Sequence, residues 1–152
     1  MMVGNIGSGK STHVNALTGG LDDYSIIGYD YQGKGLKNAF DKAIKDGVEN
    51  VIVDMQMADR KTRKPFIEKA RAAGYKVVIT ETTCDPKTAF ERITKRTDHP
   101  TLPSGEIEDT KFLQILYTFY KNFQKPSEHE YDEYTDLSTH NPYMHTDRDW
   151  ET

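Results

Sequence analysis

The stretch "GNIGSGKST", from Gly4 to Thr12, stands near the start of the chain and decides how the rest of the sequence is interpreted. It fills the pattern G-x-x-x-x-G-K-[ST], with Gly4, Gly9, Lys10 and Ser11 at the fixed positions. Glycines at such positions let backbone N–H groups wrap closely around an anion. Lys10 is expected to bridge the β- and γ-phosphate oxygens of a nucleotide, and the Ser11 hydroxyl to ligate Mg²⁺. The stretch predicts a phosphate-binding loop.

The surroundings of this loop support the prediction. Met1-Met2-Val3 can form a short strand before it, and the residues after Ser11 should begin a helix whose positive N-terminal end faces the phosphates. An ordinary glycine turn between a strand and a helix is the alternative. In the nucleotide-binding interpretation, further contacts to ATP come from Gly7, Ser8 and Thr12.

The chain then alternates between strand-like and helix-like patterns. Apolar runs predict strands over 24–27, 50–54 and 75–82, and "EYDEYTDL" (130–137) predicts a last one. Helical spacing covers 34–46, 61–74 (with Pro65 in its first turn), 85–96 and a long segment from 106. This alternation predicts an α/β fold, in which a central parallel sheet of about five strands carries helices on both faces.

Composition limits the possible classes of protein. The 152 residues suit one domain, no apolar run reaches membrane-spanning length, and the single cysteine, Cys84, is interpreted as a small buried side chain. A lone cysteine also favours a reducing compartment, so the cytoplasm is expected. The net charge of −4 is uneven, because 127–152 holds eight Asp or Glu and one Arg. The chain is therefore divided into a domain over 1–126 and an acidic segment over 127–152, with the last strand and a flexible tail.

Two acidic residues follow predicted strands. Asp30 comes after "SIIGY" and Asp54 after "VIV", and the carboxyl ends of parallel strands are where ligands bind in such sheets. Asp30 is the preferred general base for an attacking hydroxyl, and Asp54 the preferred acid on the metal or substrate side. The two could exchange roles. Each taken alone could also be a helix cap or a turn residue.

Two arginines mark a second basic element. Arg92 and Arg96 are four residues apart on a predicted helix, so they share a face, and a Pro-containing loop follows. The segment near 92–105 is a candidate lid, which would carry Arg96 to the charge that develops on a transferred phosphoryl group. Arg92 is expected to contact the nucleotide. The alternative is a solvent-facing basic pair.

The order of these features resembles the bacteriophage polynucleotide kinase family and its small AAA-type and zeta-toxin-like P-loop relatives. The matching features are "GNIGSGKST", a strand-end Asp, "VIVDMQM", the R-x-x-x-R helix and "ERITKRTDHPTLP". The resemblance implies a P-loop kinase fold with a helical lid, ATP and Mg²⁺ as cofactors, and a nucleic-acid acceptor. It also implies that Lys10, Asp30 and Arg96 are catalytic and that Asp54 organises the acceptor.

One departure from that family concerns the acceptor. The family carries an arginine shortly after the base, whereas this chain has "YDYQGKG", in which Lys34 offers a point charge without the bidentate fork of arginine. Gln56 and Arg60 complete the expected substrate side with Asp30, Lys34 and Asp54. The cluster "DRKTRK" (59–64) could form a basic groove for a polymer, or a solvated helix start.

Three hypotheses follow from the sequence. The first is a kinase for the 5′-hydroxyl of a polynucleotide, or for a hydroxymethyl base in DNA, in a host cytoplasm if the chain comes from a bacteriophage. The second is a kinase for a nucleoside, nucleotide or other metabolite. The third is a nucleotide-binding module that transfers nothing. No membrane partner is expected, and the sequence leaves the oligomeric state open.

Overall fold

The computed structural model describes residues 1–5, 8–95 and 109–138. Its strands all pair in parallel and form two sheets, one with the order β1-β4-β5 and one that pairs β2 with β3. The strands are β1 (Met2–Val3), β2 (Tyr24–Ile27), β3 (Asn50–Val53), β4 (Val78–Glu81) and β5 (Glu133–Asp136). In register, Val3 lies opposite Glu81, and Ile27 lies opposite Val53.

Helices connect these strands. The longer ones are α1 (Lys10–Thr18), α3 (Leu36–Lys45), α4 (Arg60–Ala72), α5 (Pro86–Lys95) and α6 (Asp109–Asn122). The shorter ones are α2 (Tyr29–Gln32) and the 3₁₀ turn η1 (Gly33–Gly35). Aspartates open two of the longer helices, since Asp59 and Asp85 each accept a hydrogen bond from the backbone N–H three residues on.

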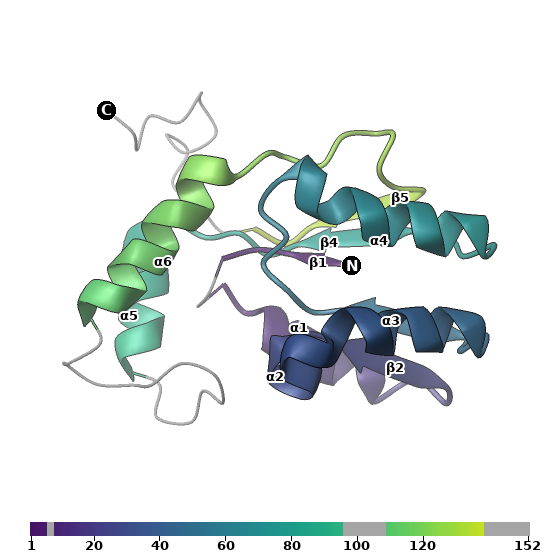
Figure 1. The fold of residues 1–152 in the computed structure, drawn as a ribbon. Coiled ribbons are helices and arrows are strands. Elements are labelled where there is room, and N and C mark those ends of the chain that lie inside the picture. The colour runs from purple at the N-terminus through teal and green to yellow at the C-terminus, as the bar shows by residue number, and fades with distance from the viewer. Residues whose placement is uncertain (6–7, 96–108, 139–152) are drawn as a thin grey trace.

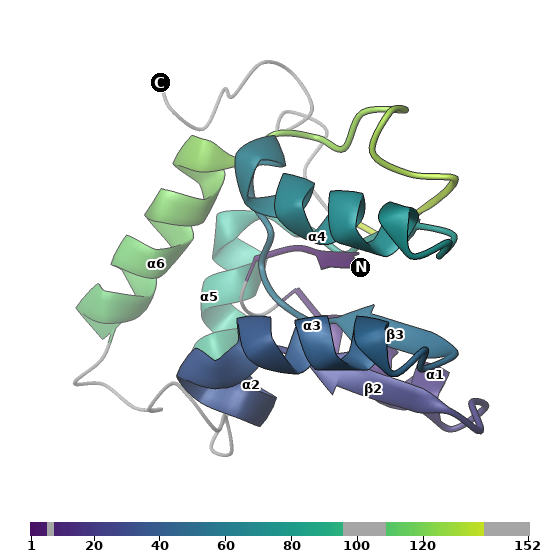
Figure 2. The same cartoon turned by 45° about the vertical axis from the view of Figure 1, so that its right-hand side comes forward.

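Helices cover both faces of the sheets. Figures 1 and 2 show α3 and α4 side by side on one face and α1 on the opposite one, with α5 and α6 together beyond one end of the strands. The core follows this arrangement. Phe40 of α3 and Phe66 of α4 pack edge to face in one buried cluster with Ile79, whereas Val14 of α1 packs with Met2 and Ile52.

The two sheets meet at the carboxyl ends of β1 and β3. There the Gly4 N–H donates to the Gln56 carbonyl over 3.0 Å, just beyond the end of each strand. The predicted α/β fold, with parallel strands and helices on both faces, is confirmed, although the strands form two sheets. Within the described residues, no helix is long and apolar enough to cross a bilayer.

Three sequence expectations are refined. Pro65 lies in the second turn of α4, which begins at Arg60, whereas the sequence pattern places it in the first turn. Its missing N–H is one that an interior helical residue would normally donate. The expected helix over 34–46 is shorter at both ends, and α2 and η1 precede it. The last strand is present as β5 and pairs with β4. The tail beyond Ser138 lies outside the described residues.

Candidate functional site

The phosphate loop ends where the first long helix begins. Gly9 precedes α1 with φ of 96°, a left-handed conformation that favours glycine. The first turn of α1 contains Lys10 and Ser11, which are half-buried, and the exposed Thr12. The Lys10 ammonium donates to the Asn5 carbonyl over 3.1 Å, so the cation lies back over the loop. Lysine and the helix N-terminus therefore lie together where an anion would bind.

Close packing against the end of β4 fixes the start of the loop. A Cβ at Gly4 would lie 2.5 Å from the Thr82 Oγ1 and 2.8 Å from the Ser8 Oγ, so only glycine fits without displacement. Those two hydroxyls are themselves hydrogen-bonded at 2.9 Å and are buried. Thr82 thus holds both ends of the loop that the structure describes. Gly7 lies outside the described residues.

Asn5 makes a second set of contacts with the residues after β4. Its side-chain oxygen accepts the Cys84 N–H over 3.0 Å, and its Nδ2 donates to the Cys84 Sγ over 3.5 Å. The Tyr120 hydroxyl of α6 donates to the Cys84 carbonyl. Asn5 and Cys84 are both fully buried, which confirms the interpretation of Cys84 as a small buried side chain. Sequence reasoning missed Asn5, because the motif leaves that position open.

Two cations act on this buried thiol. Burial raises the pKa of Cys84, while the Asn5 hydrogen bond and the charges of Arg92 and Lys10 act in the opposite direction. Arg92 is exposed on α5, and its charge and that of Lys10 both act on Cys84. The predicted contact of Arg92 with the nucleotide stays a prediction. Arg96 and the lid segment from 96 to 105 lie outside the described residues. Their roles stay predictions.

Asp30 and Asp54 form what we call the acidic edge, at the carboxyl ends of β2 and β3. Asp54 follows β3, and its N–H donates to the Ile27 carbonyl at 2.8 Å, which ties the two strand ends together. Its carboxylate accepts from the Tyr31 hydroxyl at 3.2 Å. Burial, then Asp54 and finally Asp30, raise the pKa of Tyr31 to about 12. Asp30 is exposed on the short helix α2. The structure thus brings Asp54 and Asp30 together around one tyrosine.

The candidate ligands for magnesium are Ser11 and Asp54. Ser11 lies in the first turn of α1 and Asp54 at the end of β3. No group of three or more His, Cys, Asp or Glu within the described part of the chain is arranged to hold a metal. Mg²⁺ in phosphoryl-transfer sites is usually held by one or two protein oxygens together with phosphates and water. A hydroxyl and a carboxylate fit that pattern.

The other predicted substrate residues are scattered. Lys34 is exposed in η1, and Gln56 is the residue that accepts the Gly4 N–H. The backbone N–H of Arg60 donates to the Gln124 Oε1, and its guanidinium to the Lys125 carbonyl, so its contacts are made with the segment after α6. Gln56 therefore lies beside the phosphate loop, whereas Arg60 is bound elsewhere.

Arg63 corrects the expectation of a basic groove. It is the largest fully buried side chain, and its guanidinium pairs with Glu130 at 2.7 Å and 3.3 Å. It also donates to the carbonyls of Met57, Ala58 and Gln124. Residue type alone suggested a surface cation, but the helical position of Arg63 faces the interior. Arg63 joins three segments and cannot line a groove.

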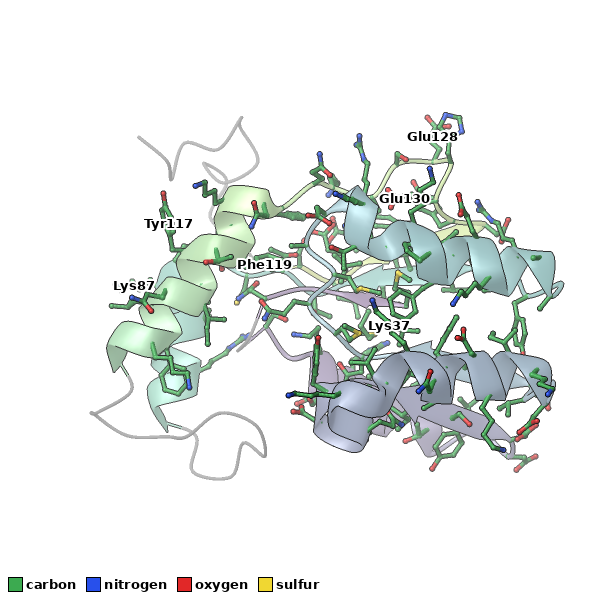
Figure 3. All side chains as sticks on the ribbon, viewed as in Figure 1. Lys37, Lys87, Tyr117, Phe119, Glu128 and Glu130 are labelled. Carbon is green, nitrogen blue, oxygen red and sulfur yellow. The ribbon has the colours of Figure 1, made fainter. Side chains whose placement is uncertain are left out.

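Arg63 and the groups that it contacts form a junction between segments, and Glu130 and Met57 belong to it. Burial acts to raise the pKa of Glu130, but hydrogen bonds from Arg63 and Ser127 outweigh it and hold the pKa below its usual value. Met57 is buried and has a φ of 52°, a left-handed conformation that is uncommon outside glycine. Figure 3 shows Glu130 beside the start of α4. The junction fixes the loop between β3 and α4, which carries Asp54 and Gln56.

One family model and two solved structures resemble the chain. A family model described as "AAA domain" matches residues 33–119, which is more than half of the chain. A structure of deoxyadenosine kinase from M. mycoides with bound dATP is 20% identical, with a TM-score of 0.42, and the match covers 90% of this chain and 89% of that one. A second structure of that enzyme, with dCMP and dCDP as products, is 19% identical, with a TM-score of 0.41 and coverage of 91% and 88%.

No curated protein sequence matches the chain. The two structural likenesses are too weak to bear on the substrate. The family match, in contrast, spans the segment from η1 to α6 and so includes Asp54, Gln56 and Arg92. This match, over more than half of the chain, shows that the chain belongs to the AAA domain family.

Proposed function

We propose that this protein is an ATP-dependent phosphotransferase that moves the γ-phosphate to a hydroxyl of a small molecule. The observation that carries the proposal is the hydrogen bond from the Gly4 N–H to the Gln56 carbonyl. This bond joins the phosphate loop directly to the segment that holds Asp54. A nucleotide in the loop would therefore have its terminal phosphate beside a carboxylate at the neighbouring strand end.

Each residue has a physical task in this proposal. Lys10 would leave the Asn5 carbonyl and bind the β- and γ-phosphate oxygens, because a phosphate carries more negative charge than a carbonyl. Asp30 or Asp54 would orient the acceptor hydroxyl and take its proton. Magnesium, held by Ser11 and by Asp54 or its bound water, would neutralise charge on the phosphates. Arg92 adds positive charge near the loop.

The proposal favours a small acceptor over a polymer. A polymer needs an extended basic surface for its phosphates. Arg63, one of the four basic residues expected to line such a surface, is buried in an ion pair, and Lys64 lies 3.8 Å from the Glu68 carboxylate. The polynucleotide and hydroxymethyl-base acceptors remain competing predictions without a supporting contact.

A transfer screen tests the proposed function. The full chain would be incubated with ATP labelled at the γ-phosphate, Mg²⁺ and separate acceptor sets: nucleosides, nucleotides, 5′-hydroxyl oligonucleotides and hydroxymethylated DNA. We expect label in the nucleoside or nucleotide set and loss of transfer in Lys10→Ala. Label only in the oligonucleotide or DNA sets would restore the polymer hypothesis. ATP binding without transfer to any set would favour the non-catalytic module.

A further inference from the structure

A hollow of about 380 Å³ lies between the loop after β3, the start of α4 and one face of α6. Ligand sites for small molecules have volumes of roughly 300–1,000 Å³, so this one suits a single ring system better than an extended ligand. Polar lining residues come from both walls. They are Gln56, Asp59 and Thr62 on one wall, and Gln114 and Asn122 on the other.

Direct hydrogen bonds hold the two walls together. The Gln124 N–H, just after α6, donates to the Ala58 carbonyl over 2.8 Å, and the Gln124 side chain accepts from the Arg60 N–H over 2.9 Å. The buried Arg63 guanidinium also donates to the Ala58 and Gln124 carbonyls. The hollow therefore has fixed walls before any ligand binds.

The helix α6 presents different residues to its two sides. Figure 3 shows Phe119 on the side toward the sheets and Tyr117 on the outer side. Phe119 is 3% exposed, whereas Tyr117 is 61% exposed. Gln114, Thr118 and Asn122 line the hollow, and the Phe119 ring beside them is already stacked on Phe123. The exposed side chains of Gln114 and Asn122 provide two amides that can hydrogen-bond to the edge of a flat ring.

The carboxylate of Asp59 sets the polarity of one wall. Its interaction with the Thr62 side chain is the main reason that the pKa of Asp59 is lowered, and its Oδ1 also accepts the Thr62 backbone N–H at 2.8 Å. Asp59 is therefore ionised at neutral pH and can only accept hydrogen bonds. The amides of Gln56, Gln114 and Asn122 can both donate and accept. The hollow suits a planar ligand with ring acceptors and an N–H₂ donor.

We propose that this hollow binds the base of an acceptor nucleoside, and that it prefers bases with an exocyclic amino group. The position of Gln56 supports the assignment, because this residue lines the hollow and also accepts the Gly4 N–H of the phosphate loop. Asp54 is two residues before it. A base in the hollow would direct its sugar hydroxyl toward the acidic edge. The inference rests on the proposed function and names its substrate class.

Two variants test the hollow without disturbing the fold. Asp59→Asn keeps an oxygen that can cap α4, since asparagine is as good an N-cap as aspartate, but it removes the charge. Gln114→Leu removes the amide from the other wall and keeps a side chain of similar size. Lys121→Ala is the matched control, because Lys121 is exposed on α6 and does not line the hollow.

Binding would be measured without ATP, by equilibrium dialysis of labelled adenosine, cytidine, inosine and uridine against the full chain. We expect adenosine or cytidine to bind more tightly than its keto counterpart. Asp59→Asn should reduce or reverse this preference by about tenfold or more, the size of a lost hydrogen bond to a charged group. Gln114→Leu should weaken binding of all four, and Lys121→Ala should change nothing.

The outcomes separate this inference from the proposed function. The assignment of the hollow would be overturned if neither Asp59→Asn nor Gln114→Leu changed nucleoside binding. It would also be overturned if the chain bound no nucleoside. Loss of ATP binding instead of nucleoside binding in these variants would assign the hollow to the donor base and also overturn it. Transfer to a different small hydroxyl would keep the proposed function. Nucleoside binding with no transfer to any acceptor would contradict the proposed function alone.

Discussion

The phosphate loop and the acidic edge lie side by side but are built differently. The loop is held by buried groups, since Asn5, Ser8 and Thr82 are at most 9% exposed and hydrogen-bonded to one another or to Cys84. The edge is open, with Asp30 exposed and Tyr31 44% exposed. We infer that the phosphate loop is formed in advance, whereas the exposed side chains of the acidic edge can adjust to a ligand. Preorganisation matters most where charge develops during the reaction.

Removing the loop cation should have the largest effect. Lys10→Ala deletes the ammonium that now lies on the Asn5 carbonyl, and it should reduce transfer by at least about 10³-fold. The fold should survive, because Lys10 is only half-buried. Single-turnover transfer and circular dichroism would measure the two effects. Near-normal turnover would show that the loop does not act on phosphate.

Two matched substitutions can separate the roles of Asp30 and Asp54. Asp30→Asn and Asp54→Asn keep size while removing the base, and loss of a general base costs roughly 10²–10⁴-fold. We expect the larger loss of turnover in Asp30→Asn and a shifted Mg²⁺ dependence in Asp54→Asn. Transfer rates at several Mg²⁺ concentrations would decide. An active Asp30→Asn beside an inactive Asp54→Asn at saturating Mg²⁺ would reverse the assignment.

Substitution of the buried Arg63 tests how much the junction stabilises the loop that carries Asp54. Arg63→Met would remove the guanidinium that pairs with Glu130 and donates to the carbonyls of Met57, Ala58 and Gln124, which should cost about 3–5 kcal/mol of unfolding free energy. Arg60→Met is the control. Its side chain is 54% exposed and lies 3.7 Å from Glu130, so about 1 kcal/mol or less is expected. Denaturant unfolding would compare them. Equal losses of unfolding free energy in the two variants would contradict the stabilising role of the junction.

A methyl group tests how closely the loop is packed. Gly4→Ala would place a Cβ against the hydrogen-bonded Thr82 and Ser8 hydroxyls, at a cost of about 1–3 kcal/mol, and should weaken ATP binding. Gly35→Ala is the matched control. No described atom lies within 4 Å of a Cβ at Gly35, and its φ of −82° suits alanine. Similar melting temperatures for both variants would refute the close packing.

The last prediction concerns how the stability of the same ion pair changes with pH. The pKa of folded Glu130 lies below its usual 4.5, so its ion pair contributes stability above that pH. This contribution is lost as the pH falls through the lower folded pKa. Glu130→Gln should therefore be less stable than the parent at neutral pH, with a difference that narrows toward pH 3. Melting temperatures across that range would measure it, and a constant difference would exclude the linkage.

Much of the fold could be predicted because periodicity reports burial. The strand predicted over 24–27 is β2, and the helix predicted over 85–96 is present as α5 (Pro86–Lys95). The boundaries near Pro65 and Lys34 were less predictable. The Asp59 cap lets α4 begin at Arg60, so Pro65 lies beyond the first turn, and glycines at 33 and 35 divide the helical pattern.

The site was predictable only where a residue type has few other uses. Lys10, Ser11 and Asp54 belong to patterns with a direct chemical meaning. Asn5 and Arg63 do not, since their roles depend on which distant segment they meet. Asn5 contacts Cys84, 79 residues away, and Arg63 contacts Glu130, 67 residues away. Spacing within one helix or loop carries no information about such partners.

The left-handed Met57 restricts how this protein can be engineered. Glycine there would relieve backbone strain of roughly 1–2 kcal/mol. It would also delete a side chain that is 2% exposed, and burial of such a side chain stabilises by roughly 1.5–3 kcal/mol. The packing term is the larger one. A designer who seeks thermostability should therefore leave this position unchanged and place new stabilising substitutions on surfaces that do not reach the loop.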